Sequence, residues 1–278
     1  MVARGLAPNG YSLHRLYRDR LAAAFIVHPR RNSKQTPWEL DRVHNLRLSQ
    51  LVRKAAGTSN ERFIHGPFPL MNTALNVQAS AKVNRRGRNA DFFVFTPLHA
   101  GSPATGYVAM TELERADPNL NLAAIMAISG AAANSNMGAN TIRPLSTTLA
   151  LLNVRLGYWL PNPKRLINHN FRKTRAGFLW QEMTSKLDEN TDRVLLTDGG
   201  HIENLGIYEL LRRRCKVIVV ADAEADAGMN FSSFIALQRY ARIDLGIRID
   251  LTWQPIAAAT RAVMAANASG TPSAGDDD

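Results

Sequence analysis

The stretch Val194-Leu195-Leu196-Thr197-Asp198-Gly199-Gly200 decides the fold expected of this chain. Its first four residues form a short apolar strand that ends at Asp198. Asn204 can cap a helix that continues to Leu211. Residues 216–222, Lys-Val-Ile-Val-Val-Ala-Asp, form a continuously apolar strand of the kind found in parallel sheets covered on both faces. Strand, helix and strand in this order predict a βαβ unit with a right-handed crossover.

The composition is that of a folded protein. The chain has 278 residues, of which 45% are hydrophobic and 21% charged, enough to bury a sizeable core. No run reaches the roughly 18 apolar residues that span a bilayer, and the start lacks the apolar segment of a signal peptide. The single cysteine, Cys215, excludes an internal disulfide and a thiolate-rich metal site. We therefore expect a cytoplasmic protein that associates with membranes only peripherally.

The positive charge is concentrated in the first third of the chain. The net charge is +11, and residues 1–90 hold 16 Lys and Arg against 4 Asp and Glu. Such a region can bind an anionic membrane surface, although a solvated surface has the same composition. We do not expect nucleic acid as a partner, because the chain has neither the aromatic strand pattern of an RNA-binding sheet nor a cysteine-histidine finger.

Several other elements follow from periodicity and residue type. Apolar residues at helical spacing predict an amphipathic helix over residues 12–27. β-Branched and aromatic residues predict strands elsewhere. The predicted strands are 72–78, 91–96 and 247–251, and the further helices are 120–133, 146–156 and 231–242. Residues 1–254 are thus expected to form one domain, and residues 255–278, rich in Ala, Thr, Gly and Ser, a disordered tail.

Asp198 and the two glycines after it are the strongest candidate for chemistry. Glycine removes the side chain that would keep another backbone at a distance, so a carboxylate at this strand end is accessible to a ligand. The alternative is a tight turn in which Asp198 has a structural role.

The run from Leu195 to Asp222 resembles the aspartate block of bacterial patatin-like phospholipases. Upstream stretches resemble the same family and extend the similarity over most of residues 12–251. They are Ala127-Ile128-Ser129-Gly130-Ala131-Ala132, Asn136-Met137-Gly138, residues 152–160, residues 12–21 and residues 69–76.

The resemblance implies an α/β fold, a mostly parallel sheet flanked by helices, and hydrolysis of the acyl esters of lipids without a metal or cofactor. In that family a serine attacks the ester and an aspartate accepts its proton. The resemblance assigns the role of base to Asp198. The residues that would support the site are Gly199, Gly200, His201, Ser129 and Gly130.

The chain departs from the family at the nucleophile. Ser12 and Ser59 each have a glycine two places before them, but His14 and Glu61 stand where the second glycine of Gly-x-Ser-x-Gly is needed. The only adjacent glycine pair is Gly199-Gly200, so the glycine-rich oxyanion loop is missing as well. We therefore expect the C-terminal part of a patatin-like domain, incomplete at its N-terminal side. By itself it should be inactive, and a partner chain would supply the missing half.

Ser129 could fill the vacant role of nucleophile, but a serine that caps the start of a helix is the simpler interpretation. His201 and Glu203 form the His-x-Glu of zinc deaminases, but the two cysteines that such a site requires are absent. Two charged clusters also have simpler explanations. Residues 212–214 complement a helix dipole, and the acidic residues of 222–226 form a solvated loop rather than a cation site.

A function of a different class also fits the sequence. The chain could be a non-catalytic basic module that docks on membranes or nucleic acid, or a split subunit that needs a partner.

Overall fold

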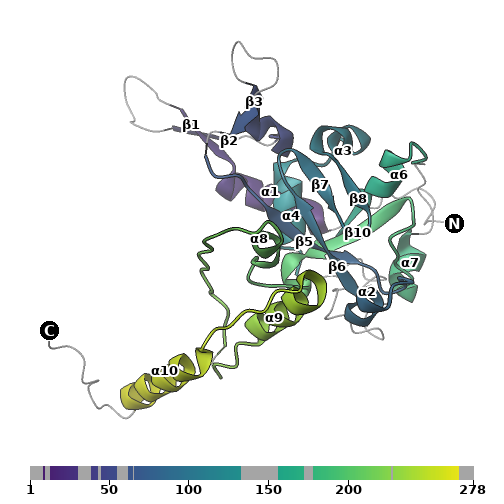
Figure 1. Cartoon of the computed structure of the whole chain (residues 1–278). Coiled ribbons are helices and arrows are strands. Elements are labelled where there is room, and N and C mark those ends of the chain that lie inside the picture. The colour runs from purple at the N-terminus through teal and green to yellow at the C-terminus, as the bar shows by residue number, and fades with distance from the viewer. Residues whose placement is uncertain are drawn as a thin grey trace. The chain divides into compact units, whose positions relative to one another are not determined.

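The computed structural model describes residues 9, 13–30, 39–42, 45–54, 62–64, 66–132, 156–171, 178–226 and 228–268 (Figure 1). The chain forms two compact units, Met1–Ile202 and Glu203–Asp278. In these parts of the chain, no helix has both the length and the apolar character needed to cross a membrane.

A six-stranded sheet is the centre of the first unit. Its strands lie in the order β8-β7-β6-β5-β10-β9, and every neighbouring pair is antiparallel. The strands are β5 (Met71–Asn76), β6 (Ala90–Phe95), β7 (His99–Ser102), β8 (Gly106–Ala109), β9 (Tyr158–Pro161) and β10 (Arg193–Asp198).

The expected mostly parallel sheet is therefore wrong. The continuous apolar pattern reports burial on both faces, and β6 has that burial along its whole length although both of its neighbours run antiparallel to it. Residues 216–222, the second strand of the expected βαβ unit, form no strand in the structure. All strand pairs among the described residues are antiparallel.

Helices cover the sheet. α4 (Leu122–Ser129) packs on β5 and β10, and α1 (Leu13–Phe25) packs on α4. α3 (Met110–Ala116) contacts β7 and β8, α6 (Pro163–Ile167) contacts β8, and α2 (Val83–Arg88) lies beside β6. The largest side chains of the resulting core are almost fully buried, among them Phe93, Phe95, Leu113, Ile125, Tyr158 and Leu196.

α4 shows how the sequence sets the bounds of a helix. Asn121 precedes it, and its side chain accepts a hydrogen bond of 2.8 Å from the backbone N–H of Ala124. Gly130 ends it. The expected helix over residues 120–133 is thus confirmed in a shorter form, as are α1, β5, β6 and β10. Residues 146–155 of another expected helix lie outside the described residues.

Two hairpins and two short helices complete the first unit. The hairpin strands are β1 (Val27–Arg30) with β2 (Glu39–Arg42) and β3 (Val52–Lys54) with β4 (Arg62–Ile64), and both pairs are antiparallel. The helices are the 3-10 turn η2 (Leu48–Leu51) and α7 (Phe178–Thr184).

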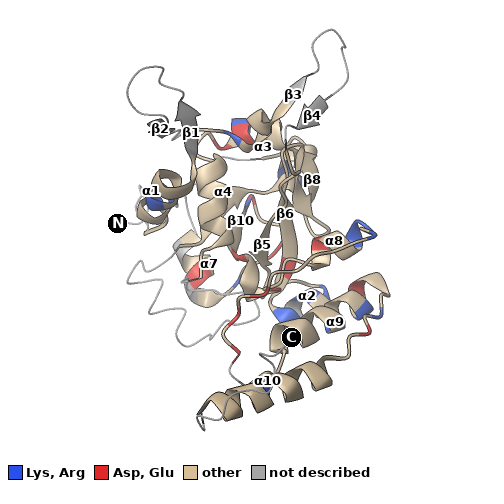
Figure 2. Ribbon diagram, turned by 90° about the vertical axis from the view of Figure 1, so that its left-hand side faces the viewer, with Lys and Arg blue, Asp and Glu red and all other residues tan. Residues whose placement is uncertain are grey.

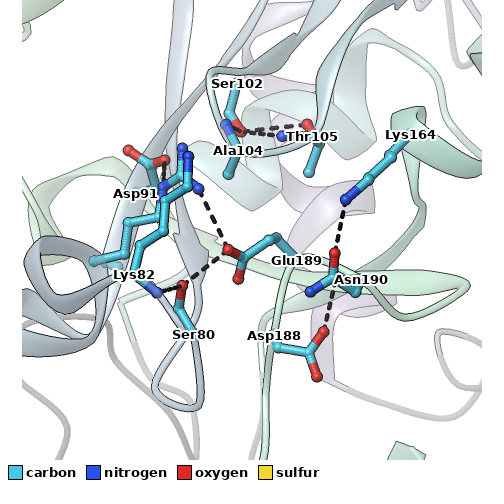
Figure 3. Close-up of polar contacts among 12 residues, drawn as sticks. Ser80, Lys82, Asp91, Ser102, Ala104, Thr105, Lys164, Asp188, Glu189 and Asn190 are labelled. Carbon is cyan, nitrogen blue, oxygen red and sulfur yellow. Dashed lines mark hydrogen bonds and ion pairs between the residues drawn. The ribbon is translucent and has the colours of Figure 1, made fainter.

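A buried ionic network ties the loop before β10 to the sheet (Figure 3). The Arg85 guanidinium contacts Asp91 at 2.7 Å and Glu189 at 3.3 Å, and Glu189 also accepts a hydrogen bond of 2.9 Å from the Ser80 hydroxyl. All four side chains are buried. Burial raises the pKa of Asp91, and the nearby Arg88 and Arg85 oppose this effect. The network fixes the approach of the chain to β10.

The second unit is helical. It contains α8 (Tyr208–Arg212), α9 (Ser232–Leu245) and α10 (Trp253–Ala268). The Tyr208 hydroxyl donates to Asp244 at 3.2 Å and so links α8 to α9. α9 confirms the helix expected over residues 231–242, whereas residues 247–251 form no strand. α10 occupies part of the stretch that was expected to be disordered.

Candidate functional site

Asp198 lies at the last position of β10, opposite Thr73 of β5. Its Oδ1 accepts a hydrogen bond of 2.8 Å from the backbone N–H of Gly200, which starts the 3-10 turn η4 (Gly199–His201). The side chain is half-buried. In the described part of the chain, no other group bonds to this carboxylate, so Oδ2 is available to a ligand.

Gly199 allows a close approach between the turn η4 and the strand β5. A Cβ atom at this position would lie 2.7 Å from the carbonyl oxygen of Asn72, in β5. Real Cβ atoms do not approach backbone oxygens so closely, so only glycine fits without movement of a strand. The first glycine of the motif therefore sets the distance between the Asp198 turn and β5.

Ser129 is bonded to the same carbonyl group. It is the last residue of α4, and its Oγ donates a hydrogen bond of 2.9 Å to the Asn72 oxygen. The structure thus brings Ser129 and Gly199 together at Asn72. The interpretation of Ser129 as a helix-start serine is wrong, because it stands at the C-terminal end of its helix.

Gly130, the next predicted residue, is held close to α1. A Cβ atom there would lie 2.7 Å from the Tyr17 hydroxyl oxygen. Gly130 therefore contributes to the packing of α1 against the end of α4, one residue away from Ser129.

His201, the last residue of η4, is buried, and both of its ring nitrogens have partners. Nε2 lies 3.0 Å from the carbonyl oxygen of Ala132, and Nδ1 lies 3.0 Å from the Thr197 hydroxyl. A carbonyl can only accept, so Nε2 carries the proton and Nδ1 accepts from Thr197. The Thr197 oxygen in turn accepts from Asn76 at 3.0 Å.

Burial lowers the pKa of His201, and the negative charge of Asp198 and the bond to Ala132 offset part of this effect. The imidazole is therefore neutral near pH 7. Since both ring nitrogens are engaged, His201 acts as a positioning residue that joins the Asp198 turn to Ala132, just after α4. It is not free to bind a metal ion.

The carboxylate of Glu203 is also occupied, within the second unit. It accepts hydrogen bonds from the backbone N–H groups of Leu205 at 2.6 Å and Tyr208 at 3.2 Å. Glu203, and not the expected Asn204, thus satisfies the backbone at the start of α8. Among the residues that the structure describes, no group of three or more His, Cys, Asp or Glu side chains is arranged to hold a metal ion.

Three residues of the site were missed in the sequence: Asn72, Asn76 and Thr197. Their signal is a polar side chain within an otherwise apolar strand. Asn76 and Thr197 are almost fully buried, and the Oδ1 atom of Asn72 is buried without a partner among the described residues.

A cavity of about 520 Å³ lies elsewhere in the first unit, lined by Arg47, Ser49, Gln50, Thr111, Glu114, Arg115 and Pro118.

The site thus contains the half-buried carboxylate of Asp198, the turn formed by Gly199 and Gly200, and the neutral His201, which holds this turn in place. The carboxylate can accept a proton from a group brought to Oδ2, but the nearby serine, Ser129, is bonded to a backbone oxygen. We found no match to the chain among protein-family models, curated proteins or solved structures.

Proposed function

We propose that this chain carries the aspartate half of a lipid acyl hydrolase of the patatin-like kind, with Asp198 as the base. The observation that carries the proposal is the free Oδ2 of a half-buried carboxylate that is held on its other oxygen by Gly200. A serine hydroxyl supplied from outside the described residues would give its proton to Oδ2 while its oxygen attacks the acyl carbonyl carbon. The proton then passes to the leaving alcohol.

The remaining site residues support this role without touching the ester. Gly199 permits the close contact with Asn72, and His201 joins the turn to Ala132, just after α4. Ser129 is not the nucleophile in this proposal, because its proton is already donated to Asn72. The proposed reaction uses no metal or organic cofactor, and its substrate is a phospholipid or another acyl ester.

The test compares the chain alone with the chain co-expressed with the polypeptide encoded directly upstream, if that sequence contains Gly-x-Ser-x-Gly. Turnover of a nitrophenyl acyl ester and labelling by a fluorophosphonate are measured. We expect neither with the chain alone. In the complex, Asp198→Asn should reduce turnover by about 10²- to 10⁴-fold, the usual contribution of a general base.

Asp250→Asn is the matched control, since Asp250 is exposed and lies far along the chain in the second unit. It should leave turnover unchanged. The proposal is wrong if the complex hydrolyses esters equally well with Asn at position 198. It is also wrong if the chain alone is labelled and Ser129→Ala abolishes the label, because Ser129 would then be the nucleophile.

A second function, docking on anionic membranes, is favoured by the exposed face of α1. On α1, the apolar residues Leu13 and Leu16 are 47% and 58% exposed, and Phe25 at the end of the helix is 69% exposed. Arg15 and Arg20 are exposed on the same helix. Apolar side chains flanked by arginines are typical of helices that bind the interface of anionic bilayers.

Co-sedimentation with vesicles of anionic and of zwitterionic lipid tests this function. We expect binding to anionic vesicles only, a decrease with added salt, and a further loss in Leu16→Glu. Val263→Glu is the control, because Val263 is 49% exposed on α10. Equal loss in both variants, or binding that ignores lipid charge, would exclude α1 as the docking surface.

A further inference from the structure

Residues 216–222, which we call the valine segment, expose apolar side chains to solvent. Val217 is 81% exposed and Val219 is 90% exposed. Within the described residues, no backbone hydrogen bond joins this segment to another part of the chain. A run of β-branched residues whose backbone donors and acceptors make no such bonds has the composition of a strand and can pair with another strand.

The chain defines both ends of the valine segment. The backbone N–H of Cys215 donates to Leu210 at 3.1 Å and so completes the turn after α8. At the other end, Asp222 accepts a hydrogen bond of 2.9 Å from the backbone of Glu224. Between these bonds lie six residues, enough for a strand of ordinary length.

Charges of opposite sign flank the apolar centre symmetrically. Lys216 precedes the run Val-Ile-Val-Val-Ala and Asp222 follows it. The basic end of α8, blue in Figure 2, precedes Lys216, and Glu224 follows Asp222. When the segment is placed antiparallel to itself, each cation therefore faces a carboxylate.

We propose that the valine segments of two copies of this chain pair as antiparallel strands about Val219. In this register Val219 faces Val219 of the second copy, Val217 faces Ala221, and Lys216 faces Asp222 on both sides. Opposite charges that face each other across a strand pair stabilise it, and like charges destabilise it. A parallel pair would place lysine beside lysine, so the charges select the antiparallel arrangement.

A second copy fits the segment better than a different protein because the complementarity is that of the segment with itself. The pairing has a two-fold axis through Val219 and so closes as a symmetric dimer. It does not depend on the proposed hydrolase activity. A two-stranded ribbon alone is only marginally stable in water, so we expect a reversible dimer that forms as the protein concentration rises.

Disulfide trapping tests the register. Cys215 is the only cysteine, and Cys215→Ser removes it from the background. Val219→Cys then places one thiol opposite its counterpart, with Cβ atoms about 5 Å apart. In Val217→Cys the two thiols are offset by four residues, about 13 Å, too far for a disulfide.

The two valines are the same residue type on the same face of the strand and are similarly exposed, so reactivity alone should not separate them. Under mild oxidation Val219→Cys should yield a covalent dimer, and Val217→Cys at least about tenfold less. Combining Val217→Cys with Ala221→Cys should restore cross-linking. Equal yields from both single variants would overturn the register.

Charge reversal tests the pairing without cysteine. Lys216→Glu or Asp222→Lys alone should raise the dissociation constant, measured by sedimentation, by about tenfold, because both charge pairs of the dimer become repulsive. The double variant should recover the wild-type value. A chain that stays monomeric at high concentration, or a dimer that is insensitive to all three variants, would overturn the proposal.

Discussion

Replacing Gly199 by alanine should destabilise the first unit. The added methyl group would stand 2.7 Å from the Asn72 carbonyl oxygen and 3.2 Å from its carbon, and both are backbone atoms. Neither can rotate away, so the turn η4 and β5 must separate by several tenths of an ångström, directly beside the paired ends of β5 and β10. The neighbouring pair of Asp198 with Thr73 and the Ser129 bond to Asn72 would be strained by the same movement.

The cost of an overpacked methyl group in such a place is about 1–3 kcal/mol. For a unit of this size that corresponds to a melting temperature lower by roughly 3–10 °C. Thermal unfolding can be followed by near-ultraviolet circular dichroism, to which the buried Trp159 contributes. Hydrogen exchange at β10 should show that the loss of protection is greatest beside Asp198.

Gly87→Ala is the matched control. Gly87 lies within α2, and nothing stands within 4 Å of where its Cβ would be. Alanine is preferred to glycine in a helix by up to about 1 kcal/mol, so this variant should be slightly more stable than the wild type. If Gly199→Ala melts at the wild-type temperature, the close approach to Asn72 does not constrain the site and the reasoning fails.

Two further predictions concern buried charges. Burial lowers the pKa of His14 from 6.5 to about 4. The His14 imidazole is therefore protonated at a higher pH in the unfolded chain than in the folded chain. Stability should therefore be complete above pH 6.5 and fall by on the order of 3 kcal/mol between pH 6.5 and 4, with a contribution of the same sign from His201. Arg85→Met should lower the free energy of unfolding by about 3–5 kcal/mol, because it removes the cation shared by buried Asp91 and Glu189.

Each of these has its own control in urea titrations. His14→Asn keeps a donor for the backbone oxygen of Leu156 but cannot be protonated, so the slope between pH 6.5 and 4 should flatten relative to the wild type. An unchanged slope would assign it to other groups. Arg248→Met removes an exposed ion pair with Asp250 and should cost less than about 1 kcal/mol. Equal losses from Arg248→Met and Arg85→Met would contradict the role of burial.

Three strands of the sheet, β5, β6 and β10, were predicted from the sequence, but their direction was not. β6, Ala-Asp-Phe-Phe-Val-Phe, was expected because its aromatic and β-branched residues favour a strand. Whether two strands run parallel or antiparallel depends on which strands become neighbours. A continuous apolar run fits both arrangements, because it indicates only that both faces of the strand are covered. The valine segment shows a second limit of the sequence. Its residues strongly favour a strand, but a segment becomes a strand only when it has a partner to pair with.

The turn of the candidate site was predicted better than its surroundings. Two glycines after a strand-end aspartate indicated a close backbone approach, and Gly199 makes one. The partner in that approach, Asn72, lies more than one hundred residues earlier in the chain, where its only signal is a polar residue in a strand. Ser129 was placed at the wrong end of its helix because the start of α4 is set by Asn121, a residue equally suited to cap a helix and eight positions earlier in the chain.

The position of β10 between β5 and β9 has a consequence for the order in which the sheet forms. Strands β5 to β8 pair with neighbours in sequence and can form while synthesis continues, whereas the bond from Asn76 to Thr197 spans 121 residues. Contacts of such long range form slowly, and this one must wait until β10 has left the ribosome. Until then β5 lacks its second neighbour and the Asp198 turn does not exist. A chain whose synthesis ends before residue 198 therefore lacks the carboxylate, and its β5 lacks the completed β10 as a neighbour.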